Sequence, residues 1–308
     1  MTTTPRILVA GDANLDLVLR GDILPRFGQA EQLLESADLV LGSSAGICAA
    51  GLARLGVETS IAGRVGDDVF GHRFREMLVQ GGVGVEGLRT TDEPTGVSVI
   101  LSNAEDRAIL TLTGALAGIT ARDVRAAATG ATHVHVAAYF LVPELARELP
   151  ELLVDLRARG ITTSLDTNWD PAERWEGVAD CLPLIDVLLP NAAEARALAA
   201  AIGVEANDAE SAARALAAGG ATVVVKDGAA GGLGVQGDRL VRAAGLARDV
   251  VDTTGAGDSF DAGFLTAWTE GADLADAVRW AAVAGSLSTR ASGGTRGQAT
   301  REEAEEYV

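Results

Sequence analysis

Short apolar runs alternate with longer segments of helical periodicity along most of the chain. The strand-like runs are residues 7–11, 59–62, 134–138, 161–165, 187–189, 222–225 and 250–252. Helical patterns cover residues 45–55, 69–79 and 143–159, and apolar positions within them recur on one helix face. Strands that alternate with helices predict an α/β fold with a doubly wound, mostly parallel sheet flanked by helices.

A second group of strand-like runs lacks crossover helices. These runs are residues 15–20, 33–41, 96–101 and 108–113. The last two form a predicted hairpin around Asn103, Glu105 and Asp106. We expect one α/β domain with a small β-sheet, built from about residues 13–41 and 95–114, that acts as a lid over a cleft. The alternative is an antiparallel extension of the main sheet.

Charge and composition exclude several classes of protein. The 308 residues carry 43 acidic and 25 basic side chains, a formal net charge of −18, which argues against binding to nucleic acid or to an anionic membrane surface. No apolar run reaches the roughly 20 residues of a membrane span. The first residues, MTTTPR, lack the features of a signal peptide. Cys48 and Cys181 are too few for a disulfide scaffold, so we expect a cytoplasmic protein.

Three familiar motifs fail a test of context. Lys226 is the only lysine, and it does not stand in a Walker A loop. The match to G-x-G-x-x-G at residues 82–87 follows a helical pattern rather than a strand, so it does not indicate a dinucleotide site. His133 and His135 share one face of a strand, but no third metal ligand is evident, which favours a structural role.

The segment DTTGAGDSFDAG, residues 252–263, carries the clearest chemistry. A predicted strand over residues 248–252 leads into it, and a helix follows. Glycines allow a tight turn and close approach of a ligand, and the amides at a helix start form an anion site. Asp258 at this position is a candidate general base for a hydroxyl proton. The alternative is that Asp258 only caps the helix.

The same segment resembles the C-terminal signature of the PfkB carbohydrate kinases, the ribokinase-like family. Similar motifs follow in order along nearly the whole chain: GDANLD at 11–16, GSSAGICAAGLARLG at 42–56, GRVGDDVFG at 63–71, LPNAAE at 189–194 and KDGAAG at 226–231. The resemblance implies a ribokinase-like fold, an ATP-dependent kinase that phosphorylates an alcohol group, and a lid that pairs two subunits into a homodimer.

The resemblance also implies roles for individual residues. Catalysis would use Asp258 as the base and an anion hole of Gly255, Ala256 and Gly257. The acceptor pocket would contain Asn14, Asp16, Gly42, Ser43, Gly46 and Trp169. ATP would lie along Lys226, Gly228, Gly231, Ala282 and Gly285. Mg²⁺ and its waters would be organised by Asn191 and Glu194. In many family members a monovalent cation such as K⁺ lies beside the anion hole, and here its site would be Asp252, Thr254, Ser288 and Gly293.

Several of these residues have a plainer interpretation. Asn191 and Glu194 have the spacing of a helix capping box, which is compatible with a role near the metal. Asn14 and Asp16 share a face if their strand continues, and otherwise form a turn. Lys226 either reaches a phosphate as a point charge or is a solvated surface residue.

Departures from the family pattern bear on the acceptor. Ser43 replaces the second glycine of the N-terminal signature, Gly46 replaces its asparagine, and Thr167 replaces the proline before Asn168. These changes put ribose in doubt but leave the catalytic segment intact. We expect a kinase of a small sugar or sugar acid. The alternatives are a nucleoside kinase, for which Tyr139, Phe140 and Trp169 would supply a base platform, and a non-catalytic sugar-binding protein.

Overall fold

A large sheet forms the centre of the molecule. The computed structural model describes residues 4–102, 107–246 and 249–308. Nine strands stand in the order β13-β12-β11-β10-β9-β8-β1-β4-β5, and all neighbours pair in parallel except β12 with β11 and with β13. Their bounds are β1 Arg6–Ala10, β4 Glu58–Gly66, β5 Gly84–Thr91, β8 His133–Val136, β9 Thr162–Leu165, β10 Val187–Leu188, β11 Thr222–Lys226, β12 Gly232–Gln236 and β13 Arg239–Ala243. The predicted doubly wound, mostly parallel sheet is confirmed.

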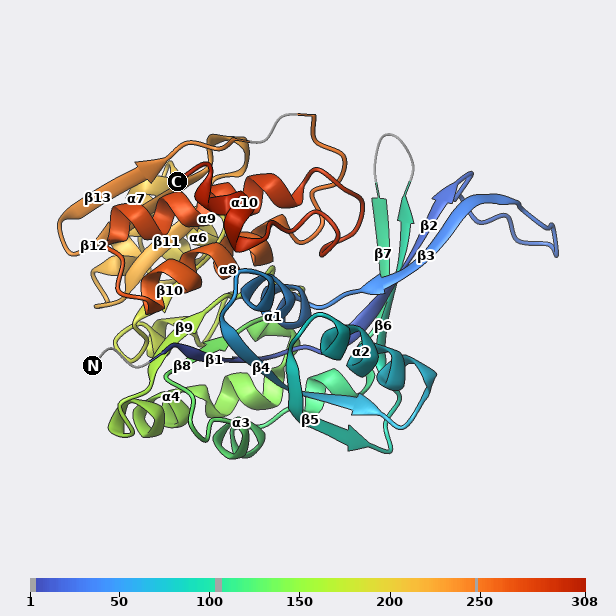
Figure 1. Cartoon of the computed structure of the whole chain (residues 1–308), viewed down its shortest axis with the longest axis horizontal. Helices are drawn as coiled ribbons and strands as arrows, with labels where there is room; N and C mark the ends of the chain where they lie inside the picture. The colour runs from blue at the N-terminus through green and yellow to red at the C-terminus, as the bar shows by residue number, and fades with distance from the viewer. Residues whose placement is uncertain (1–3, 103–106, 247–248) are drawn as a thin grey trace.

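Helices cover both faces of this sheet (Figure 1). Their bounds are α1 Ser44–Arg54, α2 Val69–Gln80, α3 Ala121–Ala127, α4 Pro143–Ala158, α5 Val178–Cys181, α6 Ala192–Ala201, α7 Ala209–Ala217, α8 Ala256–Thr269, α9 Leu274–Ser288 and α10 Arg301–Glu305. Along β1 the side chains alternate: Ile7 and Val9 join a core with α1, α2, α8 and α9, whereas Leu8 and Ala10 join a core with α3, α4, α6 and α7. None of these helices is both long and apolar enough to cross a membrane, as far as the described residues extend.

A separate four-stranded sheet stands beside the main body (Figure 1). Its order is β3-β2-β6-β7, with β2 Asn14–Gly21, β3 Leu34–Leu41, β6 Gly96–Ser102 and β7 Arg107–Leu112. The antiparallel pairing of β6 with β7 confirms the predicted hairpin, while Asn103, Glu105 and Asp106 lie outside the described residues. This sheet is not an extension of the main sheet, so that alternative is wrong. Its action as a lid remains a prediction.

The strand expected at residues 250–252 is absent, and Arg248 lies outside the described residues. Val250 and Val251 are exposed, and the amides of Val251 and Asp252 both donate to the carbonyl of Thr289, at 2.9 and 3.2 Å. The apolar run is therefore held by the end of α9 rather than by a neighbouring strand. The sequence also gave no clear signal for β12, whose glycines weaken the strand pattern.

Candidate active site

The carboxyl ends of the parallel strands and the start of α8 meet in one place. Asp12 lies two residues beyond β1, Asp166 directly follows β9, and Lys226 ends β11. In open α/β sheets this edge is where ligands bind. Neither Asp12 nor Asp166 was predicted as a site residue, although both stand just after predicted strands.

The backbone at the start of α8 packs closely against the segment that contains Gly294. Gly255 is its N-cap residue and has φ 71°, in the left-handed region. A Cβ at this position would lie 2.8 Å from the Gly294 Cα, so only glycine fits. No side chain caps this helix end, which favours binding of an anion there. The Ala256 amide donates to the Thr253 carbonyl at 3.2 Å, so it would have to exchange this partner to join the anion hole.

Asp258 lies in the first turn of α8 and is mostly shielded from solvent. Its pKa is raised to about 8, chiefly because protein atoms replace water around it, and further because Asp166 and Asp12 carry like charge. The Ser44 hydroxyl donates to this carboxylate and opposes the rise. Ser44 in turn accepts a hydrogen bond from Asn168 Nδ2 at 2.6 Å. A carboxyl with a pKa near neutrality, held in one orientation, has the properties of a general base.

Ser44 and Asn168 were missed as site residues. Ser44 stands in a run of small residues at the start of α1, which gave no sign of a role in the site. Its amide donates to Asp12 Oδ2 at 3.1 Å. Asn168 was noted only as part of the family-like segment. In the structure its φ of 53° lies in the left-handed region, which is uncommon for residues other than glycine.

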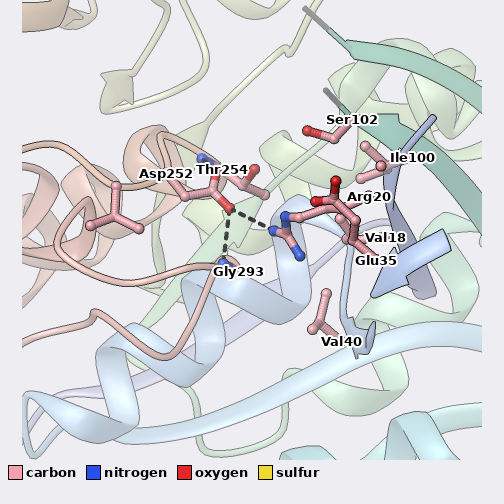
Figure 2. A pocket seen from close by; sticks show the side chains of 11 residues that line it. Val18, Arg20, Glu35, Val40, Ile100, Ser102, Asp252, Thr254 and Gly293 are labelled. Atoms are coloured by element: carbon pink, nitrogen blue, oxygen red, sulfur yellow. Dashed lines mark hydrogen bonds and ion pairs between the residues drawn. The ribbon is translucent and has the colours of Figure 1, made fainter. Parts of the chain in front are cut away.

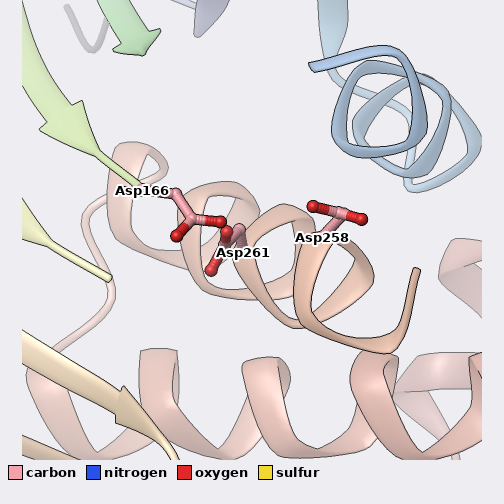
Figure 3. A group of neighbouring side chains, drawn as sticks. All are labelled: Asp166, Asp258 and Asp261. Atoms are coloured by element: carbon pink, nitrogen blue, oxygen red, sulfur yellow. The ribbon is translucent and has the colours of Figure 1, made fainter. Parts of the chain in front are cut away.

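Asp258 belongs to a cluster of three carboxyl groups. Asp166, Asp258 and Asp261 each place an oxygen within 4.8 Å of the others (Figure 3). Lys226 Nζ lies 2.8 Å from an oxygen of Asp166 and 2.8 Å from an oxygen of Asp261. The Lys226 side chain is only 11% exposed, so the prediction of a solvated surface lysine is wrong.

The charges in this cluster follow from burial and pairing. Burial alone would lower the pKa of Lys226, but the carboxylates of Asp166 and Asp261 raise it above its usual value. The pKa of Asp166 is lowered, because the pull of Lys226 outweighs its burial. Burial and the charge of Asp166 raise the pKa of Asp261 well above its usual range. Asp166 is therefore the carboxylate whose negative charge Lys226 stabilises, whereas the surroundings of Asp261 favour its neutral form.

Asn191 and Glu194 form the capping box that was considered from their spacing. Asn191 Oδ1 accepts from the amides of Ala193 and Glu194, both at 2.9 Å, and Glu194 Oε2 accepts from the Asn191 amide at 2.9 Å. Glu194 is buried, which together with the charge of Asp166 raises its pKa to about 7. Their role toward Mg²⁺ remains a prediction.

One pocket brings together the residues expected to contact ATP. It has a volume of about 280 Å³, and its lining includes Lys226, Gly228, Gly231, Ala282 and Gly285. Ala256, Gly257 and Phe260 complete the wall on the side of α8. Gly231 has φ 97°, and a Cβ there would lie 2.2 Å from the Ala243 carbonyl oxygen. Because Ala256 and Gly257 line the pocket, it reaches the expected anion hole.

Three of the expected acceptor residues, Asn14, Asp16 and Gly42, lie together at the start of β2. Asn14 Nδ2 donates to Asp16 Oδ1 at 3.0 Å and to the Ser98 hydroxyl at 3.4 Å. A Cβ on Gly42 would lie 2.3 Å from Asp16 Oδ1. Asn14 and Asp16 both lie in β2, which begins at Asn14 and pairs with β6, so the alternative of a turn there is wrong. Ser98, on β6, was not anticipated.

The remaining expected acceptor residues have local structural partners. Ser43 has φ 68° and caps α1, because its hydroxyl accepts from the Gly46 amide at 2.7 Å. Trp169 is about half exposed and packs edge-on against Trp175, with ring centroids 5.0 Å apart.

His133 and His135 both contact the Ser164 hydroxyl at 2.8 Å within the core, which agrees with their structural assignment.

The residues expected to bind a monovalent cation are grouped only in part. Asp252 accepts hydrogen bonds from the amides of Thr254, at 2.9 Å, and Gly293, at 3.0 Å. The Ser288 hydroxyl instead donates to the Gly285 carbonyl of its own helix at 2.8 Å.

Comparison with known proteins identifies the family. Residues 5–301 match the model described as "pfkB family carbohydrate kinase". The chain belongs to this family. It is therefore a phosphotransferase that acts on an alcohol group, and this membership sets aside the non-catalytic alternative.

Individual relatives extend over nearly the full chain. A ribokinase of Bacillus subtilis is 29% identical over 304 residues, which cover 98% of this chain and 99% of the relative. An ATP-dependent ribose-1-phosphate kinase of Halopiger xanaduensis is 30% identical over 297 residues, covering 94% and 93%. The solved structure of Arabidopsis thaliana ribokinase with ribose and ATP superposes with a TM-score of 0.80 at 26% identity, covering 99% of both chains. The fold of this PfkB kinase is therefore ribokinase-like.

Proposed function

We propose that this kinase transfers the γ-phosphoryl group of ATP to a hydroxyl of a small sugar or sugar acid, with Asp258 as the general base. The observation that carries the proposal is the position of Asp258. It directly follows Gly257, which lines the same pocket as Lys226 and Gly231. It also accepts a hydrogen bond from Ser44, two residues after Gly42, and Gly42 lies against Asp16. Relatives that are ribokinases support this acceptor class.

The residues of the chain suit each part of the transfer. Asp258 takes the hydroxyl proton of the acceptor, the freed oxygen bonds to the γ-phosphorus, and the bond from that phosphorus to the ADP oxygen breaks. The start of α8 stabilises the charge on the transferring group. Asn14 and Asp16 orient the acceptor through its hydroxyls.

Magnesium is part of the proposal. The acidic and amide oxygens of Glu194 and Asn191 are suitable for holding its waters, and the ion would neutralise phosphate charge. Closure of the small sheet over the acceptor, a homodimer formed through that sheet, and a cytoplasmic location also stay predictions. K⁺ beside the anion hole is not part of this proposal, because the Asp252 carboxylate already accepts hydrogen bonds from the amides of Thr254 and Gly293.

An acceptor screen tests the proposal. The protein is incubated with ATP and Mg²⁺ and with sugars, sugar acids, sugar phosphates and nucleosides in turn, and ADP release is measured. We expect turnover with a small sugar or sugar acid. Asp258→Asn should lower kcat by about 10³-fold or more while ATP still binds, whereas Asp208→Asn, at the exposed N-cap of α7, should not.

The outcomes separate the alternatives. Turnover confined to nucleosides would replace the acceptor class by the nucleoside alternative. Full turnover by Asp258→Asn would overturn the assignment of the base.

A further inference from the structure

Arg20 brings a positive charge from the small sheet to the segment that leads into α8. Its Nη2 lies 3.8 Å from Asp252 Oδ2 (Figure 2). Its Nη1 donates to Asp38 Oδ2 at 3.1 Å. Its guanidinium also donates to the Ser292 hydroxyl. Arg20 and Asp38 belong to β2 and β3, whereas Asp252 and Ser292 belong to the main body.

Asp252 is surrounded by hydrogen-bond donors. Oδ1 accepts from the Thr254 amide at 2.9 Å, and Oδ2 accepts from the Gly293 amide at 3.0 Å and from the Ser292 hydroxyl at 3.4 Å. Together with Arg20, these groups give both carboxylate oxygens partners of positive or partly positive charge. The carboxylate is only 19% exposed, so it interacts strongly with a nearby cation.

This arrangement does not fit a bound monovalent cation. With Arg20 in place, the Gly293 amide points at the carboxylate and the Ser288 hydroxyl donates to Gly285, so neither directs an oxygen atom at an ion there. An ion at Asp252 Oδ2 would also lie within a few ångströms of the Arg20 guanidinium, and two like charges at that separation repel.

We propose that Arg20 takes the place of a monovalent cation at Asp252, so that the positive charge beside the anion hole belongs to the chain and K⁺ is not required. Arg20 is a positioning residue in this scheme, because it acts on the start of α8 through Asp252 and contacts no reacting atom. The part of the proposal that concerns turnover rests on the proposed kinase function.

A purely structural ion pair makes a different prediction. If Arg20 only ties the small sheet to the body, its loss lowers stability but creates no response to K⁺. If Arg20 occupies the place of a cation, its loss leaves Asp252 with an uncompensated charge that K⁺ can neutralise. Selective rescue by K⁺ therefore distinguishes the two.

The first measurement needs no variant. Thermal unfolding of the wild-type protein is followed in KCl and in choline chloride at equal ionic strength, and turnover is followed in the same solutions once an acceptor is known. We expect equal Tm values, and rates that agree within about twofold. A K⁺-specific rise in Tm, or activation by K⁺ of about tenfold or more, would overturn the proposal.

The second measurement uses three variants in the same solutions. Arg20→Met should show a K⁺-specific rise in Tm of about 2 °C or more and a K⁺-specific gain in turnover. Arg20→Lys, which keeps the charge, should show neither response. Arg26→Met removes an exposed pair with Asp22 from the same part of the chain and serves as the matched control.

Failure of each idea has its own signature. Absence of turnover with every acceptor would count against the proposed function, while the Tm comparison would still decide the role of Arg20. No K⁺ response in Arg20→Met that has folded would show that Arg20 is only a structural pair and would overturn the proposal. If Arg20→Met does not fold, the wild-type comparison decides alone.

Discussion

The Lys226 ammonium group lies 2.8 Å from Asp166 Oδ2, beneath the start of α8. It lies equally close to Asp261 Oδ2, yet the pKa of Asp166 is lowered and that of Asp261 is raised. The same lysine therefore lies between two carboxyl groups whose surroundings favour opposite protonation states.

Substitution of these two acids should have unequal effects. Asp166→Asn leaves Lys226 buried without an ionised partner, and we expect a loss of about 3–5 kcal/mol in the free energy of unfolding. Asp261→Asn replaces an acid whose raised pKa favours the neutral form by a neutral amide, and should cost less than about 1.5 kcal/mol. Urea denaturation of both variants checks this. Equal losses would show that the charge is shared between the two acids.

Removal of Ser44 should change how activity depends on pH. The Ser44 hydroxyl donates to Asp258 and lowers its pKa, so Ser44→Ala should move the rise of kcat toward alkaline pH by about one unit. A pH–rate profile measures the shift. Ser211→Ala, in the exposed capping box of α7, is the control, and an unchanged profile for Ser44→Ala would contradict the geometry.

Asp258 should make the folded state less stable as pH rises. Its pKa in the folded protein is raised from 3.8 to about 8, so the folded state binds a proton that the unfolded state has released. Relative to Asp258→Asn, the wild-type protein should lose about 2 kcal/mol or more of unfolding free energy between about pH 4 and pH 8. Urea unfolding at several pH values gives the difference, and a difference that grows in the opposite direction would refute the shift.

Gly255→Ala should be far more damaging than its backbone angle alone explains. Gly255 and Gly160 have nearly the same φ, 71° and 73°, but a Cβ at Gly160 would meet nothing within 4 Å. Gly160→Ala should cost about 1 kcal/mol from strain in the left-handed region. Gly255→Ala adds the contact with Gly294 and should lower kcat by about 10²-fold or more. Similar effects on stability and rate in both variants would exclude the close contact as the cause.

Glu194→Gln separates the helix cap from the metal role. Glutamine still accepts a hydrogen bond from the Asn191 amide, so Tm should change by less than about 2 °C. Loss of the negative charge should raise the Mg²⁺ concentration needed for half-maximal rate by about tenfold. A magnesium titration of the rate tests this, and an unchanged requirement would leave Glu194 with the cap alone.

Sequence patterns predicted most of the sheet and the order of its elements, because buried parallel strands are apolar throughout. The hairpin of β6 and β7 was found for a different reason, because two short apolar runs flank a polar turn, and these strands pair antiparallel outside the main sheet. The run at residues 250–252 was misassigned, since two valines before an aspartate have the same pattern whether their amides donate to a neighbouring strand or to the end of a helix. The state of Lys226 was also beyond prediction, because its partners Asp166 and Asp261 are 60 and 35 residues away.

The burial of Lys226 has a consequence for chemical labelling. It is the only lysine in the 308 residues, and its ammonium group is both shielded and paired. Amine-directed reagents therefore find no lysine on the surface of the described chain. Reaction at this single side chain would require the region beneath the start of α8 to open, so its rate would report how often that opening occurs.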